Sequence, residues 1–216
     1  MGICKKDIAS TEEGLLNYGL SRSAREKVFL IGDSIREGYC PYVEEFLDGT
    51  FEVAYPNENC RNTQYVLTSL RGWTTMFDDV DKVKVVCFNC GHWDIAHWNR
   101  ESESLTTETD YCRNLKRIIQ RLKKSFAYAE IVFFTTTPVN ESLLSTMANP
   151  RTNEEIERYN QLAIKVAKEE GVCVGDMYEV VSRFGEECYK DYAHLKDEYC
   201  ERLGEYVASV IKSCIQ

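Results

Sequence analysis

Short apolar runs alternate along the chain with longer segments in which apolar residues recur every three or four positions. Five runs, at residues 28–31, 51–55, 83–89, 131–135 and 172–174, have the length and composition of buried strands. The third and fourth are apolar enough to be covered on both faces, which is typical of central strands in a parallel sheet. The pattern therefore predicts a five-stranded parallel sheet.

Three segments carry apolar residues at the 3.6-residue period of an amphipathic helix. Their apolar positions are Tyr111, Leu115, Ile118, Ile119, Leu122 and Phe126; then Ile156, Tyr159, Ala163, Val166 and Ala167; and finally Tyr199, Leu203, Val207, Val210, Ile211 and Cys214. Strands alternating with such helices favour the α/β class, with three layers in the order helices, sheet, helices. Residues 56–62 and 136–150 break the pattern after the second and fourth strands. We expect these two loops to share an edge of the sheet.

The chain of 216 residues fits a single domain, which we place at residues 27–216. Residues 1–26 precede the first strand and show weak helical character at 12–18. We interpret them as an N-terminal extension packed on the domain.

Composition and charge exclude several classes of function. The formal charge of −9, with scattered Lys and Arg, argues against a nucleic-acid partner, and no apolar stretch is long enough to cross a membrane. The first residues lack the apolar core of a signal peptide, and Lys6 stands where myristoylation requires Ser or Thr. The expected location is therefore the cytoplasm, with no membrane partner.

The ten cysteines favour buried thiols over disulfides, because the chain is large and shows no leader. Cys87 and Cys90 have the spacing of zinc ligands. They lie on a predicted strand, where positions i and i+3 face opposite sides, and no second pair completes four ligands. We therefore expect no metal site.

The segment Gly32-Asp33-Ser34 follows the first predicted strand directly. A serine at a turn from a buried strand into a helix projects from the carboxyl end of the sheet, where helix N–H groups favour negative charge. This is the position of a nucleophile, although Gly-Asp-Ser is also ordinary turn chemistry. Whether Ser34 is a nucleophile or part of an ordinary turn depends on whether the chain also contains a base and its partner.

Only three histidines are candidates for that base, and Asp191 precedes His194 by three positions just before the last predicted helix. In a turn, this spacing brings the carboxylate within reach of the imidazole of the same loop. The carboxylate would then fix the tautomer while the other ring nitrogen takes the serine proton. The alternative is a charge at a helix N-terminus beside a solvated histidine.

Taken together, Gly32-Asp33-Ser34 and Asp191-x-x-His194 resemble the GDSL or SGNH hydrolase family. The resemblance spans nearly the whole chain and implies a flavodoxin-like α/β/α fold. It implies a serine esterase that works through an acyl-enzyme, with Ser34 as nucleophile, His194 as base and Asp191 as its orienting partner. It implies no metal or organic cofactor.

The two middle blocks of that family match only in part. The third block is usually Gly-x-Asn-Asp, and here it reads Gly91-His92-Trp93-Asp94. Trp93, which has one N–H, would replace the Asn donor to the oxyanion. Alternatively His92 turns inward, or Trp93 only packs and the oxyanion hole has one donor fewer.

The second block usually places a Gly whose backbone N–H faces the oxyanion. Arg61 stands at that position, followed two residues later by Thr63. Its N–H would serve if the local φ is negative, so the expected oxyanion donors are Ser34, Arg61 and Trp93. Otherwise Arg61 is a surface residue.

Substrate contacts are expected from the polar residues of these blocks and the segment beyond them, namely Asp33, Arg61, His92, Asp94 and His97. The edge is rich in Asn, Arg, Trp and Tyr, which suits sugars better than long acyl chains. The sequence thus predicts hydrolysis of a small ester, with removal of a short acyl group, such as acetyl, from a carbohydrate. An O-acyltransferase on the same triad and a non-catalytic carbohydrate-binding protein are the alternatives.

Overall fold

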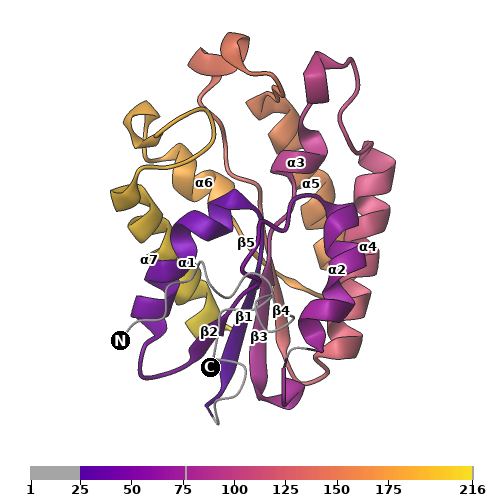
Figure 1. Cartoon of the computed structure of the whole chain (residues 1–216), viewed down its shortest axis with the longest axis vertical. Coiled ribbons are helices and arrows are strands. Elements are labelled where there is room, and N and C mark those ends of the chain that lie inside the picture. Colours follow the sequence, from indigo (N-terminus) through magenta and orange to yellow (C-terminus); the bar gives the residue numbers. More distant parts are fainter. Residues whose placement is uncertain (1–24, 76, 216) are drawn as a thin grey trace.

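The structure is a computed structural model that describes residues 25–75 and 77–215. Within them, five parallel strands form one sheet in the order β2-β1-β3-β4-β5 (Figure 1). The strands are β1 (Lys27–Ile31), β2 (Glu52–Ala54), β3 (Val83–Phe88), β4 (Glu130–Phe134) and β5 (Cys173–Gly175). The predicted five-stranded parallel sheet is confirmed, and the third and fourth strands lie in its interior.

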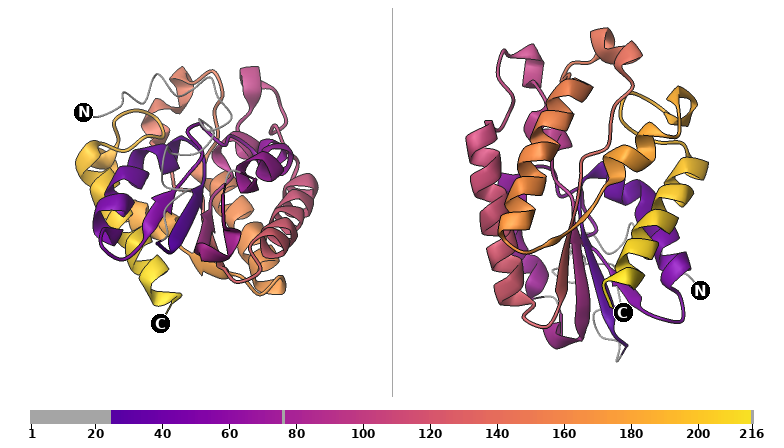
Figure 2. Two further views of the ribbon diagram at one scale, coloured as in Figure 1. Left: turned by 60° about the horizontal axis from the view of Figure 1, so that its bottom comes forward. Right: turned by 180° about the vertical axis from the view of Figure 1, so that it is seen from behind.

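Helices cover both faces of the sheet (Figures 1 and 2). One face carries α1 (Ser34–Leu47), α6 (Met177–Ser182) and α7 (Asp197–Ser213), and the other carries α2 (Thr63–Thr74), α4 (Glu108–Ser125) and α5 (Asn153–Glu169). Val28 and Leu30 of β1 pack with the first group, whereas Phe29 and Ile31 pack with the second. Successive residues of a strand point to opposite faces, so β1 contributes to both cores.

The remaining helical segments are short. They are α3 (His92–Ile95) and the 3-10 turns η3 (Val80–Lys82), η4 (Trp98–Arg100), η5 (Glu141–Thr146) and η6 (Glu186–Cys188). The turn η5 lies inside the segment predicted as a loop. It forms because the side chain of Asn140 accepts a hydrogen bond from the backbone N–H of Ser142 at 3.1 Å, which caps the turn.

The three predicted amphipathic helices correspond to α4, α5 and α7. The expected helical character at residues 12–18 lies outside the described residues, and the division at residue 26 stays a prediction. No helix in the described part of the chain is long and apolar enough to cross a membrane.

The cysteines of the described residues all carry free thiols, and most of them are buried, as predicted. Cys87 belongs to the core beneath α1 and α7, and Cys90 to the core beneath α2, α4 and α5. The two side chains therefore lie on opposite faces of the sheet, as predicted, although Cys90 itself follows the end of β3. Cys173 is the exposed exception.

Candidate active site

Ser34 is the first residue of α1, where the chain leaves β1. Asp33 caps the helix: its Oδ1 accepts hydrogen bonds from the backbone N–H of Ile35 at 3.0 Å and from Nδ2 of Asn89 at 3.1 Å. A Cβ at position 32 would lie 2.2 Å from Oδ1 of Asn89, so the close approach of these segments requires Gly32. The tripeptide thus sets Ser34 at a helix N-terminus, at the carboxyl end of a central strand.

Three side chains form one hydrogen-bonded chain at this point. Nε2 of His194 lies 2.8 Å from Oγ of Ser34, and Nδ1 of His194 lies 2.9 Å from Oδ2 of Asp191. Oδ1 of Asp191 also accepts hydrogen bonds from the backbone N–H groups of Ala193 and His194. Burial acts to raise the pKa of Asp191, but these N–H groups and the imidazole outweigh burial and lower the pKa. The carboxylate is therefore held ionised and aimed at the imidazole.

The loop that carries Asp191 and His194 is fixed at two places. The backbone N–H of Lys190 donates to the carbonyl of His194 at 2.8 Å, which closes the turn. The backbone N–H of Asn140 donates to the carbonyl of Tyr192 at 2.8 Å, which ties the loop to the segment after β4. Backbone hydrogen bonds thus fix the position of the loop that carries His194.

A cavity of about 590 Å³ opens beside the Ser34–His194 pair. The residues that line it follow all five strands: Ser34, Asn59, His92, Trp93, Trp98, Met147, Ala148, Asn149, Arg151, Asp191, Tyr192, Ala193 and His194. The indoles of Trp93 and Trp98 pack together with ring centroids 5.2 Å apart. Loops 56–62 and 136–150 therefore do meet Ser34 at one edge of the sheet, as predicted.

His92 turns inward, as one of the sequence-based alternatives proposed. Its Nε2 lies 3.0 Å from Oγ1 of Thr137, while its Nδ1 is buried and has no hydrogen-bond partner among the described residues. The pKa of His92 is well below its ordinary value because of burial, with further contributions from Arg151 and His194. The wall of the cavity therefore holds a neutral imidazole with one unused ring nitrogen.

Asp33 and Asp94 do not contact the cavity, and their predicted roles in substrate binding are wrong. Both carboxylates are buried. Asp94 accepts hydrogen bonds from the backbone N–H of Thr63 at 3.0 Å and from its hydroxyl at 2.6 Å, and Asn114 donates to that hydroxyl. Burial raises the pKa of Asp94 to about 6 in spite of these bonds. Asp33 caps α1, and Asp94 secures the start of α2.

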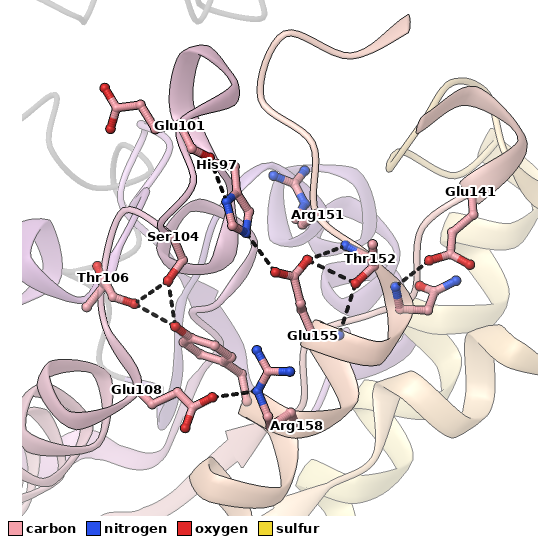
Figure 3. A network of polar contacts seen from close by, with 12 residues as sticks. His97, Glu101, Ser104, Thr106, Glu108, Glu141, Arg151, Thr152, Glu155 and Arg158 are labelled. Carbon is pink, nitrogen blue, oxygen red and sulfur yellow. Dashed lines mark hydrogen bonds and ion pairs between the residues drawn. The ribbon is translucent and has the colours of Figure 1, made fainter. Parts of the chain in front are cut away.

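His97 does not line the cavity of Ser34 but a neighbouring one, and its side chain lies between Glu101 and Glu155 (Figure 3). Its Nε2 lies 2.7 Å from Oε1 of Glu155, and its Nδ1 lies 2.9 Å from the carbonyl of Glu101. Burial acts to lower the pKa of His97, but these two acceptors together raise it. Glu155 also forms a capping box with Thr152 at the start of α5. The sequence-based assignment of His97 to the substrate cavity is therefore wrong, since the side chain braces α5.

Comparison with known proteins assigns the chain to a family. Residues 30–199 match the GDSL-like lipase/acylhydrolase family. The chain belongs to this family. It is accordingly a carboxylic ester hydrolase, and the resemblance drawn from Gly32-Asp33-Ser34 and Asp191-x-x-His194 is confirmed.

Relatives of the GDSL family agree with this assignment. A GDSL esterase/lipase of Arabidopsis thaliana is 27% identical over 214 residues, which cover 87% of this chain and 86% of the relative. An N-acetylneuraminate (7)9-O-acetyltransferase of Danio rerio is 32% identical over 92 residues, which cover 43% of this chain and 11% of that protein. Among solved structures, an acetyl xylan esterase superimposes with a TM-score of 0.69 over 86% of this chain and 99% of its own, at 17% identity. That structural likeness shows the shared SGNH hydrolase fold.

The second block of this GDSL hydrolase departs from the sequence-based expectation. Arg61 has φ of +53°, and its backbone N–H donates to Oδ1 of Asn59 at 2.8 Å. The condition of a negative φ fails and the N–H is already used, so the predicted oxyanion role of Arg61 is wrong. Its guanidinium is exposed and lies over the ring of Tyr65, 4.7 Å from the centroid. The predicted substrate contact through Arg61 is therefore also absent from the cavity lining.

Asn59 and Arg151 line the cavity, and sequence reasoning missed both. Asn59 stands two residues before Arg61, and an Asn at that spacing is the ordinary signal for a side chain that bonds the backbone two positions later. Arg151 follows Pro150 at the end of the predicted loop 136–150, whose place at the sheet edge was expected. An arginine at the end of such a loop carries no local signal of where its guanidinium will lie.

Proposed function

We propose that this GDSL hydrolase is a serine esterase that removes a short acyl group, acetyl above all, from a carbohydrate or a similar small ester. The observation that carries the proposal is the hydrogen-bonded chain from Ser34 through His194 to Asp191. These distances are those of a nucleophile, its base and the group that orients the base.

In the first half of the reaction, Oγ of Ser34 attacks the ester carbonyl while Nε2 of His194 takes its proton. Asp191 holds the imidazole in the required tautomer and stabilises the imidazolium. His194 then returns the proton to the leaving alcohol, and the acyl group remains on Ser34. In the second half, His194 deprotonates a water that attacks the acyl-enzyme and restores Ser34.

The oxyanion hole of this proposal uses the N–H of Ser34 at the start of α1 and two side chains. Asn59 replaces the backbone donor expected at Arg61: because its Oδ1 accepts from Arg61, its Nδ2 is the atom left to donate. His92 supplies the third donor through Nδ1, with the hydroxyl of Thr137 donating to Nε2. His92 is favoured over Trp93 because its Nδ1 is buried and has no partner among the described residues, and such a group costs free energy unless a ligand satisfies it.

The carbohydrate substrate is supported by the lining of the cavity. The paired rings of Trp93 and Trp98 offer flat apolar surface, and Asn59 and Asn149 offer amide groups beside it. This combination suits a sugar ring with its hydroxyl groups. The structural likeness to an acetyl xylan esterase supports acetyl as the acyl group.

The test is hydrolysis of p-nitrophenyl acetate, of longer p-nitrophenyl esters and of acetylated xylo-oligosaccharides by the wild type and by Ser34→Ala. We expect acetate to be released fastest and Ser34→Ala to be inactive. Ser209→Ala on the exposed face of α7 is the matched control and should retain full activity. Equal background rates for wild type and Ser34→Ala on every substrate would overturn the proposal.

A second candidate is an O-acetyltransferase on the same three residues, in which a sugar hydroxyl rather than water resolves the acyl-enzyme. It is favoured by the similarity to the N-acetylneuraminate (7)9-O-acetyltransferase of Danio rerio. Product analysis with and without an acceptor sugar separates the two: acetylated acceptor formed at the expense of free acetate indicates transfer.

A further inference from the structure

Arg151 stands at the wall between the active-site cavity and the neighbouring cavity that contains His97. Its backbone N–H donates to the hydroxyl of Tyr192 at 3.0 Å, and that hydroxyl donates to the carbonyl of Arg151. Its Nη1 donates to the carbonyl of His92 at 2.7 Å. Arg151 is thus tied both to the loop that carries the catalytic histidine and to the inward-facing histidine after β3.

The guanidinium of Arg151 is charged but has no counterion among the described residues, and it forms no ion pair with any of them. Its Cζ lies 5.6 Å from the centroid of the Tyr192 ring. Nε is buried and has no hydrogen-bond partner in the described part of the chain. Nη2 likewise has none among the described residues but, unlike Nε, keeps accessible surface. An arginine side chain does not lose its proton in proteins, and an unpaired buried charge is costly, so this arrangement calls for an anionic ligand.

The carboxylates in the two cavities that Arg151 lines, and that of Asp33, form hydrogen bonds with groups other than Arg151. Glu155 binds His97 and Thr152, and Glu141 accepts from the backbone N–H of Asn153, as Figure 3 shows. Asp191 is paired with His194. The charge of Asp33 reaches Arg151 only at longer range, since that carboxylate caps α1. None of these groups neutralises the guanidinium.

We propose that Arg151 binds a carboxylate of the substrate, so that the preferred ester is an acylated acidic sugar rather than a neutral one. This inference rests on the proposed function and names its substrate class. Arg151 is the one lysine or arginine among the described residues that line the active-site cavity. A single available terminal nitrogen, in a cavity that the acidic Asp191 also lines, suits a singly charged carboxylate better than a doubly charged phosphate.

A purely structural role for Arg151 makes a different prediction. If the side chain only tied the loops together, its loss would slow the hydrolysis of charged and neutral substrates equally. If it binds a carboxylate, its loss reduces the preference for the charged substrate. The quantity that separates the two roles is therefore the ratio of kcat/KM for a charged and a neutral substrate.

The first experiment measures acetate release from an acetylated methyl glucuronoside and from the matching uronamide, in which a neutral amide replaces the carboxylate. We expect the wild type to prefer the uronate. Arg151→Met should reduce that preference by about 10- to 100-fold, the range of a hydrogen bond to a charged group. Arg151→Lys should retain part of it.

Arg100→Met is the matched control, because Arg100 lines the neighbouring cavity but not that of Ser34. It removes the same charge and should leave the preference unchanged. An equal loss on both substrates in Arg151→Met, or loss of the preference in Arg100→Met instead, would refute the carboxylate site.

The second experiment measures binding without turnover, using Ser34→Ala and methyl glucuronoside by calorimetry or NMR. We expect binding that is lost in Ser34→Ala/Arg151→Met and is weaker for the uronamide and for inorganic phosphate. Binding without hydrolysis by the wild type would leave the carboxylate site standing and refute the esterase. Hydrolysis without preferential binding of the uronate would leave the esterase standing and refute the carboxylate site. Tighter binding of phosphate would contradict the assignment to a carboxylate.

Discussion

The carboxylate of Asp94 holds the first residue of α2, because it accepts hydrogen bonds from both the backbone N–H and the hydroxyl of Thr63. Burial nevertheless raises the pKa of Asp94 to about 6. The folded protein therefore binds this proton more tightly than the unfolded chain does. The stability that the raised pKa contributes is fully present below the unfolded pKa of about 4 and is lost as the pH rises through 6.

We expect Asp94→Asn to flatten this pH dependence. A raise of about two pKa units corresponds to about 3 kcal/mol, so between pH 4 and pH 7 the wild type should lose up to about that much stability relative to Asp94→Asn. Urea unfolding at a series of pH values measures the difference. Asp78→Asn, at an exposed position, is the control and should follow the wild type. Parallel curves for wild type and Asp94→Asn would show that folding does not raise the pKa of Asp94.

Asp191→Asn should leave the fold intact and reduce kcat on p-nitrophenyl acetate by roughly 10³- to 10⁴-fold, since an amide no longer stabilises the imidazolium of His194. The side chains of both residues are half exposed, so the substitution buries no new polar group. Circular dichroism checks the fold, and steady-state kinetics check the rate. A loss below tenfold would show that Asp191 does not orient the base.

Substitutions of His92 and Trp93 show which of the two side chains donates to the oxyanion, because only loss of the donor should lower kcat. His92→Leu should lower kcat by about 10²-fold with little change in KM, because it removes a donor that acts in the transition state. Trp93→Phe keeps an aromatic face without the N–H and should stay within a few-fold of the wild type. The reverse pattern would assign the donor to Trp93. Since His92 stays neutral, its loss should not move the pH profile of kcat/KM.

Asn59→Asp tests the second side-chain donor. The carboxylate keeps an acceptor for the backbone N–H of Arg61 but places negative charge beside the developing oxyanion. We expect kcat to fall by at least the 10²- to 10³-fold that is typical for removal of one oxyanion donor. Asn59→Ala should lower kcat by a similar factor and should also loosen the turn at Arg61. Unchanged kcat in both variants would exclude Asn59 from the oxyanion hole.

Local patterns in the sequence were sufficient for the architecture and for the three residues of the proposed triad. Residues 83–88 are recognisable as a strand because their apolar side chains are neighbours in the sequence. Asp191 and His194 are recognisable as a pair because they are three positions apart in one turn. The helix α2 was not predicted, although Val66, Leu70 and Trp73 keep the helical period. Its start has a local cap, since the side chain of Asn62 accepts a hydrogen bond from the backbone N–H of Tyr65, and Asp94, which is 31 positions away from Thr63, adds a remote acceptor.

The lining of the cavity, in contrast, required the folded chain. Asp33, Arg61 and Asp94 stand in blocks of the family pattern and His97 lies just beyond one, yet none of them lines the cavity of Ser34. Each of them instead forms a hydrogen bond elsewhere, at a helix N-terminus, in an Asx turn or with a carboxylate on another helix. Sequence alone does not rank these competing partners, because their distances depend on how remote segments pack.

The helix cap in the turn at Gly32-Asp33-Ser34 was determined by the sequence itself, because the carboxylate of Asp33 accepts from a backbone N–H only two positions away, that of Ile35. That His194 meets Ser34 across 160 positions was decided only by the tertiary structure. So was the place of Arg151 in the wall of the same cavity, with no counterion among the described residues. The physical reason is that loops after parallel strands converge at one edge, where the twist and packing of the whole sheet set which side chains touch.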